Sequence, residues 1–165
     1  MKKRFTILMM MLFILLGGAK WNVLNAQETT ITIGEGTKVE AFVPSNINYD
    51  NTISQQIFLE ADFQGKTGDI THYAFKCAKD LSNTTRYFKI YMYNTDKTSF
   101  SGNTDWVNAE NNKLVFEGDV LYGPKDTWTV IEFDTPFTYN GGNVIVCIND
   151  SAPYAPATMN YYSME

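Results

Sequence analysis

The sequence is poor in the residues that enzymes use for catalysis, with one His and two Cys among 165 residues. A catalytic Cys requires an activating base, and His72 is the one imidazole that could supply it. His72 lies in a predicted strand, residues 69–78, where its neighbours provide no metal-ligand spacing. No nucleophile elbow, phosphate-binding loop or zinc pattern is present. The carboxylates are scattered, so their spacing does not identify a glycosidase-type pair. These absences argue against an enzyme.

The two cysteines, Cys77 and Cys147, both fall in predicted strands. In an exported protein they could form a disulfide. The alternative is two separate buried thiols that pack as small apolar side chains. Both alternatives remain open here, because sequence spacing does not give the distance between the two Cα atoms.

The sequence also lacks an apolar run long enough to cross a membrane. The longest one, residues 5–16, is shorter than the roughly 20 residues that a transmembrane helix needs. It follows three basic residues at 2–4 and precedes Leu24-Asn25-Ala26. This order predicts a signal peptide, residues 1–26, cleaved after Ala26. We therefore expect a secreted or cell-surface protein whose remaining part, residues 27–165, is soluble and not inserted in a membrane.

Basic residues are scarce. Four of the 13 basic residues and none of the 18 acidic ones lie in residues 1–26, so the remainder carries about nine more acidic than basic groups. An acidic surface repels phosphate backbones, which argues against nucleic acid as a partner. The same charge is compatible with a bound cation, although solubility alone would explain it.

Alternating strands are the main structural signal. In residues 86–93, Phe88, Ile90 and Met92 share one face while Tyr91 and Tyr93 share the other, which predicts a half-buried central strand. No segment has helical periodicity. Further runs, separated by Gly, Pro and Asn turns, predict strands at residues 29–33, 38–43, 54–59, 69–78, 113–117, 127–133, 143–148 and 159–162.

This pattern predicts an all-β protein with one domain, an antiparallel two-sheet β-sandwich of the jelly-roll kind. We expect Thr135-Pro136 to end the strand at residues 127–133, because proline cannot donate to a central ladder.

A long polar loop follows the central strand, and it contains two of the three carboxylates that we consider for calcium. Calcium prefers oxygen ligands from loops, and Asp96, Asp105 and Asp150 could converge at one end of a sandwich. The alternative is that these residues stabilise turns by hydrogen bonding to nearby backbone. No other cofactor is indicated.

Aromatic residues make up 15% of the chain. Tyr91 and Tyr93 share a strand face, while Trp106 and Trp128 border turns. Exposed rings of this kind could stack on a glycan or bind a host or surface protein. In a two-sheet fold, however, outward-facing aromatics are often covered by loops.

Several segments occur together in a familiar order: ITIGEGT (31–37), SQQIFL (54–59), ITHYAFK (70–76), KIYMYNTDKTSF (89–100), DW (105–106) and FDTPFTYNGGNVIVCIND (133–150). This order resembles a β-sandwich module of secreted and surface proteins of Bacteroidetes bacteria, found alongside gingipain/haemagglutinin-type adhesin regions. The resemblance implies a non-catalytic accessory or adhesion module with a jelly-roll-like fold and no defined ligand. Such modules usually continue beyond the point where this chain stops, so it resembles either a stand-alone or a truncated version.

Three functions follow as alternatives. The first is a secreted binding or adhesion module for a glycan or a host protein. The second is a structural spacer, or a remnant of a larger secreted protein. The third and weakest is an extracellular hydrolase, because no nucleophile or base is recognisable.

Overall fold

Strand β4, Thr85–Thr95, lies at the centre of the fold in a computed structural model that describes residues 28–34, 38–40, 42–109, 112–153 and 161–163. Phe88, Ile90 and Met92 are buried and alternate with more exposed residues, so the predicted half-buried strand is confirmed. The predicted signal peptide, residues 1–26, lies outside the described residues.

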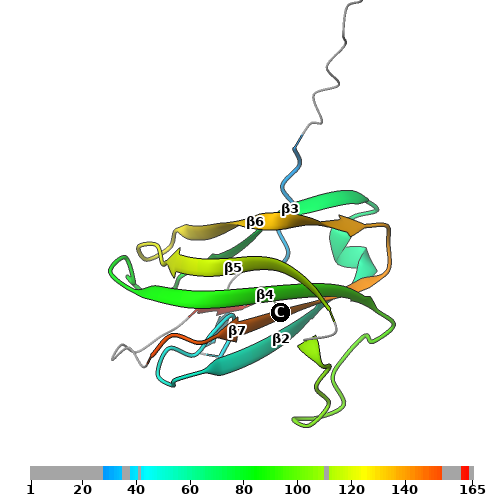
Figure 1. Ribbon diagram of the computed structural model, residues 1–165. Coiled ribbons are helices and arrows are strands. Elements are labelled where there is room, and N and C mark those ends of the chain that lie inside the picture. Colours follow the sequence, from blue (N-terminus) through cyan, green and yellow to red (C-terminus); the bar gives the residue numbers. More distant parts are fainter. Residues whose placement is uncertain (1–27, 35–37, 41, 110–111, 154–160, 164–165) are drawn as a thin grey trace, which may run out of the picture. The chain divides into compact units, whose positions relative to one another are not determined.

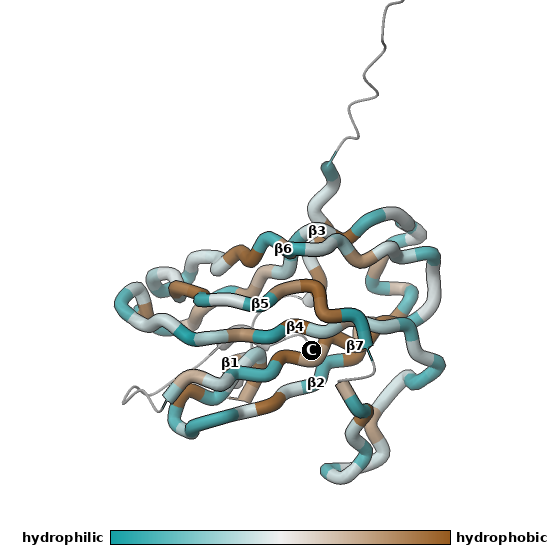
Figure 2. Tube along the Cα trace, viewed as in Figure 1, coloured by the Kyte–Doolittle hydropathy of each residue, from teal (hydrophilic) through white to brown (hydrophobic). Residues whose placement is uncertain are grey.

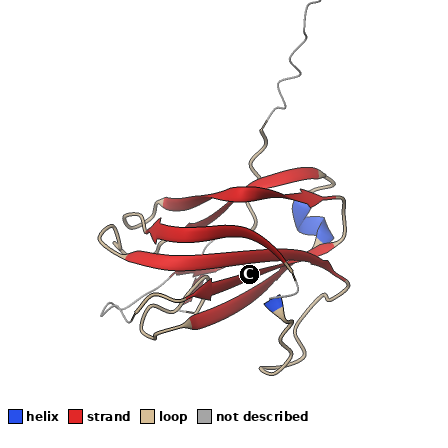
Figure 3. Cartoon of the chain, viewed as in Figure 1, coloured by secondary structure: helices blue, strands red, loops and turns tan. Residues whose placement is uncertain are grey.

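The strands belong to one compact unit, Ile31–Glu165, and form an all-β antiparallel sandwich, as predicted (Figures 1 and 3). One sheet has the order β2-β7-β4-β5, the second pairs β3 with β6, and a short ribbon pairs β1 with β8. The jelly-roll assignment stays a prediction. The elements are β1 Lys38–Glu40, β2 Thr52–Phe58, the 3-10 helix η1 Glu60–Phe63, β3 Gly68–Lys76, β5 Lys113–Leu121, β6 Trp128–Tyr139, β7 Asn143–Asp150 and β8 Tyr161–Ser163.

The inner faces of the two sheets form one apolar core. Ile90 of β4 pairs with Ile148 of β7, and both are fully buried. Aromatic rings join the layers, because Tyr122 makes edge contacts with Phe75 of β3 at 5.2 Å and with Phe88 of β4 at 6.1 Å between ring centroids. Figure 2 shows the alternation of apolar and polar residues along the strands that this burial requires.

Several strand predictions were wrong. The strand predicted at residues 113–117 runs on to Leu121, and residues 42–43 of the strand predicted at 38–43 are not strand. Residues 29–33 are not a strand, although Ile31 and Ile33 still pack against the core. The strand predicted to end before Thr135-Pro136 continues to Tyr139. Pro136 is tolerated because the pairing of β3 with β6 shifts register between Ile70 and His72, so the proline lies in a bulge where no ladder bond is required.

The bulged part of β6 is also linked to β5. The Asp134 carboxylate accepts a hydrogen bond from the Glu117 backbone N–H at 3.0 Å, and the Lys113 ammonium donates to the Pro136 carbonyl.

Within the described residues, no helix has the length and apolar character needed to cross a membrane.

Candidate functional site in the loop after the central strand

The long loop that follows β4 is fastened to the four-stranded sheet. At its start, the Asn143 side-chain amide of β7 donates to the Lys97 carbonyl at 3.0 Å. Further along, the Gln55 amide of β2 donates to the Val107 carbonyl at 2.5 Å and accepts from the Val107 N–H at 3.0 Å. One side chain thus satisfies both backbone groups of Val107, as a neighbouring strand would. In Figure 1 this loop is the light-green segment below the ends of β4 and β5.

The loop lies against the outer face of the sheet. Gln55 pairs with Cys147, and Cys147 pairs with Tyr91, so the three side chains share the face opposite Ile90 and Met92. An outer face would normally be open to water. Instead, Cys147 and its neighbour Ile145 are fully buried.

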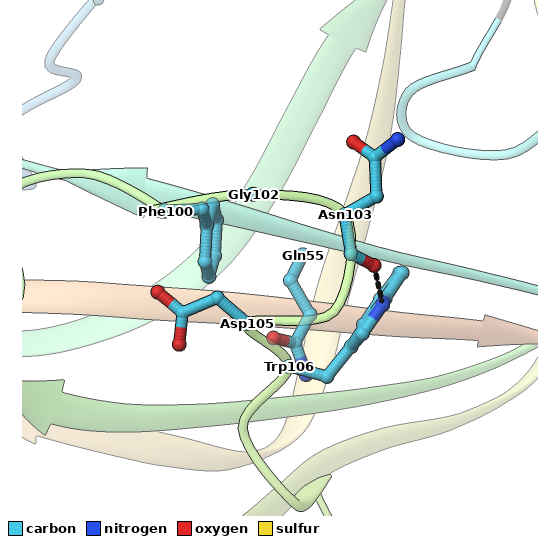
Figure 4. A pocket seen from close by; sticks show the side chains of 6 residues that line it. All are labelled: Gln55, Phe100, Gly102, Asn103, Asp105 and Trp106. Carbon is cyan, nitrogen blue, oxygen red and sulfur yellow. Dashed lines mark hydrogen bonds between the residues drawn. The ribbon is translucent and has the colours of Figure 1, made fainter.

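Between the loop and β2 lies a hollow of about 270 Å³, shown in Figure 4. The Trp106 indole N–H donates to the Asn103 carbonyl at 2.8 Å, which fixes the orientation of the ring. The Trp106 side chain nevertheless remains 55% exposed. The lining residues are Gln55, Phe100, Gly102, Asn103, Asp105 and Trp106.

Asp105 is the charged residue among the described residues that line the hollow. The Lys97 ammonium donates to one carboxylate oxygen at 2.6 Å, and the Ser101 N–H and hydroxyl donate to the other at 2.9 and 3.0 Å. These bonds, with that from Lys97 the strongest, lower the pKa of Asp105 to about 2. The carboxylate is therefore ionised at neutral pH, and its position is held by the loop itself.

Tyr91 and Tyr93 do not form the open aromatic row that was one reading of the sequence. Both are only partly exposed, which agrees with the alternative that loops cover outward-facing rings. The Tyr93 hydroxyl is a buried side-chain polar atom without a hydrogen-bond partner in the described structure. Burial raises its pKa to about 12.

Trp128 is 51% exposed but belongs to a different surface. It starts β6, where it alternates with the buried Thr129 and Ile131 and therefore points outward from the second sheet. The outer faces of a sandwich lie on opposite sides of its core. The structure thus separates Trp128 from Trp106.

The structure does not bring together the three carboxylates considered for calcium. Asp96 follows Thr95, which pairs with Asn143 at one end of β7, whereas Asp150 is at the other end. Seven residues of strand separate these ends by roughly 24 Å. Asp105 is occupied by Lys97 and Ser101, and the described residues contain no group of three His, Cys, Asp or Glu arranged for a metal.

Asp150 instead forms a fully buried ion pair with Arg86, with Nε and Oδ2 2.7 Å apart. The Ser45 hydroxyl and the Ala152 N–H also donate to the carboxylate. The guanidinium donates to the carbonyls of Ala152 at 3.1 Å and of Pro153. This network stabilises the ends of β4 and β7 and leaves Asp150 no role at the hollow.

Cys77 and Cys147 are free and buried, so the disulfide alternative does not hold in the structure. Cys77 lies within hydrogen-bonding distance of Thr129, at 3.7 Å between Sγ and Oγ1, whereas Cys147 accepts from Gln55 of β2, also at 3.7 Å. Burial raises the pKa of both thiols.

Sequence reasoning missed Gln55, Phe100 and Gly102 as site residues. Gln55 occupies an outward position of a strand, where a polar residue normally signals only contact with water. No pattern in the sequence indicated that this position faces a loop some fifty residues away.

No family model, curated protein or solved structure matches the chain. The similarity to the Bacteroidetes module therefore remains a prediction from the sequence.

Proposed function

We propose that this protein is an exported, non-catalytic carbohydrate-binding module that holds its ligand in the hollow beside Trp106. The proposal is carried by one observation: a half-exposed indole, held in a fixed orientation, lines the same small hollow as the Asp105 carboxylate.

This combination suits a sugar. The C–H groups on one face of a sugar ring are apolar and stack on an aromatic ring, whereas its hydroxyls require hydrogen-bond partners at the edge. Trp106 supplies the ring and the Asn103 amide supplies polar groups at its edge. The Gln55 amide and the Asp105 carboxylate also line the hollow, but they are already bonded to Val107 and to Lys97 and Ser101. Export is supported by the signal-peptide pattern of residues 1–26.

A glycan array with the purified protein, followed by calorimetric titration of the best ligand, tests the proposal. Replacing Trp106 by Ala should lower affinity roughly tenfold or more, because a buried aromatic contact is the usual centre of binding energy. Trp128→Ala is the matched control, since Trp128 is equally exposed on the other sheet. Loss of binding in Trp128→Ala but not in Trp106→Ala would refute the site.

A second variant blocks the hollow without removing any contact. A Cβ atom added at Gly102 would meet no atom within 4 Å, and Gly102 does not have a positive φ, so a larger side chain fits the backbone there. Gly102→Leu should therefore leave stability nearly unchanged and reduce binding by occupying the hollow. Unchanged binding in this variant would place the ligand elsewhere.

A further inference from the structure

Two aromatic rings line the hollow. Phe100 is partly buried, Trp106 is more exposed, and Figure 4 shows the two rings on either side of the Gln55 side chain. If the face of a sugar ring stacks on the Trp106 indole, the Phe100 ring meets another part of the same sugar. An aromatic ring in that place favours an apolar group over a hydroxyl, because a hydroxyl buried there would lose its bonds to water.

Most polar groups of the hollow are already bonded to the loop itself. The Gln55 amide and the Trp106 indole N–H are bonded to backbone groups of the loop. Both oxygens of the Asp105 carboxylate accept hydrogen bonds from loop residues. The Asn103 amide makes no hydrogen bond within the described residues, but its side chain is exposed and lies beside the two rings, not between them (Figure 4). A sugar hydroxyl placed between the rings would therefore find few free partners.

Building on the proposed function, we propose that the hollow recognises the methyl group of a 6-deoxy sugar and discriminates against the parent hexose, which carries a hydroxyl at C6. The Trp106 indole stacks on the apolar face of the sugar, and the C6 methyl group packs on the Phe100 ring. The parent hexose places a hydroxyl against the same ring. An apolar pocket discriminates against an added hydroxyl by up to about a hundredfold. Because Trp106 remains 55% exposed, we expect the smaller ratio of about tenfold here.

The test is a calorimetric titration of the purified protein with sugar pairs that differ only at C6. The probes are the methyl glycosides of L-fucose, L-rhamnose and D-quinovose. Each is compared with the hexose of the same configuration, which is L-galactose, L-mannose or D-glucose. We expect at least one 6-deoxy sugar to bind about tenfold more tightly than its parent hexose.

Gly102 offers a matched pair of variants that change the polarity of the hollow. A Cβ atom at Gly102 would meet no atom within 4 Å, and Gly102 does not have a positive φ, so both Ala and Ser fit the backbone. Gly102→Ser adds a hydroxyl that can bond to the C6 hydroxyl of the hexose, so the preference for the 6-deoxy sugar should narrow by about threefold or more. Gly102→Ala adds the same Cβ atom without a hydroxyl and should keep the preference.

A third variant removes the proposed methyl contact. Phe100→Ala should abolish most of the preference, because the C6 methyl group loses the ring on which it packs. Thr104→Ala is the control, since Thr104 is an exposed residue of the same loop that does not line the hollow. The readout is a ratio of two affinities in one variant, so a general loosening of the loop does not imitate the loss of this contact.

The outcomes distinguish this inference from the function on which it rests. Equal or tighter binding of the parent hexose in every pair, or a preference that survives Phe100→Ala, would overturn the methyl contact but leave carbohydrate binding intact. An unchanged preference in Gly102→Ser would overturn the argument from the unpaired hydroxyl. Binding of an arrayed glycan without binding of any methyl glycoside would overturn this inference alone. Failure of every probe and every arrayed glycan to bind would overturn both proposals.

Discussion

The side chain of Gln55 makes two hydrogen bonds to the backbone of Val107, a residue 52 positions away, and so imitates one rung of a β-ladder. These bonds place the loop after β4 on the outer face of the sheet. The hollow lies between this loop and β2, and Trp106 and Asp105 both belong to the loop. So do Lys97 and Ser101, which donate hydrogen bonds to the Asp105 carboxylate. The proposed binding site therefore depends on a residue that belongs to β2, outside the loop.

We expect Gln55→Ala to release the loop. The change removes two hydrogen bonds of about 0.5–1.5 kcal/mol each and should lower the free energy of unfolding by about 1–2 kcal/mol. Amide hydrogen exchange at Val107 should accelerate, while exchange in the core of β4 changes only with global stability. Ile53→Ala is the control, because Ile53 is exposed on the same strand face two residues away. Equal protection of Val107 in both variants would contradict the anchoring role of Gln55.

Breaking the buried ion pair should be costly. Either Arg86→Met or Asp150→Leu leaves an uncompensated charge in the interior, which typically lowers the free energy of unfolding by about 3–5 kcal/mol. The double variant should cost clearly less than the sum of the two single changes, because it leaves neither charge unpaired. Urea unfolding of the four proteins measures this difference, and additive costs would show that the two groups are not coupled.

The pKa of Asp105 makes the loop sensitive to acid. Its value falls from the usual 3.8 to about 2 in the folded protein, chiefly because Lys97 and then Ser101 donate to the carboxylate. A lower pKa in the folded state means that the ionised group stabilises the loop above about pH 4, and that this contribution is lost as the pH falls towards about 2. A carbon-13 NMR titration of the carboxyl group checks the value. In Lys97→Met the pKa of Asp105 should rise towards 3.8. A pKa near 3.8 in the wild-type protein would contradict the hydrogen bonds from Lys97 and Ser101 to the carboxylate.

Removing the side-chain hydroxyl should change the free energy of unfolding differently at Tyr93 and at Tyr73. Both are buried and have a pKa of about 12, but Tyr73 accepts a hydrogen bond from the Gln56 amide at 3.1 Å, whereas the Tyr93 hydroxyl has no partner in the described structure. Tyr93→Phe should therefore leave the free energy of unfolding unchanged or raise it, by up to about 1 kcal/mol.

Tyr73→Phe should instead lower the free energy of unfolding by about 1 kcal/mol, because the Gln56 amide loses its hydrogen-bond acceptor. Urea unfolding of both variants gives the comparison. A loss in Tyr93→Phe as large as that in Tyr73→Phe would mean that the Tyr93 hydroxyl is bonded after all.

The fold was largely predictable because period-two alternation is a local property of the chain. It identified the core face of β4 and indicated a sandwich. It failed at Thr135-Pro136, because a bulge opposite Thr71 makes room for a proline, and bulges depend on the partner strand. The buried Arg86 was visible in principle, since it shares the inward face with Phe88 and Ile90. A charge at such a position demands a partner, and Asp150 supplies it.

The site was much less predictable, because its parts meet only through tertiary packing. Trp106 and Asp105 were recognised as candidates, for an aromatic surface and for a metal respectively, and they line one hollow. Trp128 was grouped with Trp106 because both border turns, and Asp150 with Asp105 because both could converge at one end of a sandwich. The structure places Trp128 and Asp150 elsewhere. Gln55 carries no local signal, because its role comes from the loop that happens to fold over it.

The indole N–H signals of Trp106 and Trp128 in a proton–nitrogen NMR spectrum test the proposed function most directly. The spectrum is recorded while the best ligand of the glycan array is added, and Trp106→Ala and Trp128→Ala identify the two signals among those of the three tryptophans. We predict that the Trp106 signal shifts with the same saturation curve as calorimetric binding and that the Trp128 signal stays in place. A ligand that binds and shifts Trp128, or that leaves Trp106 unmoved, would contradict a carbohydrate site in the hollow.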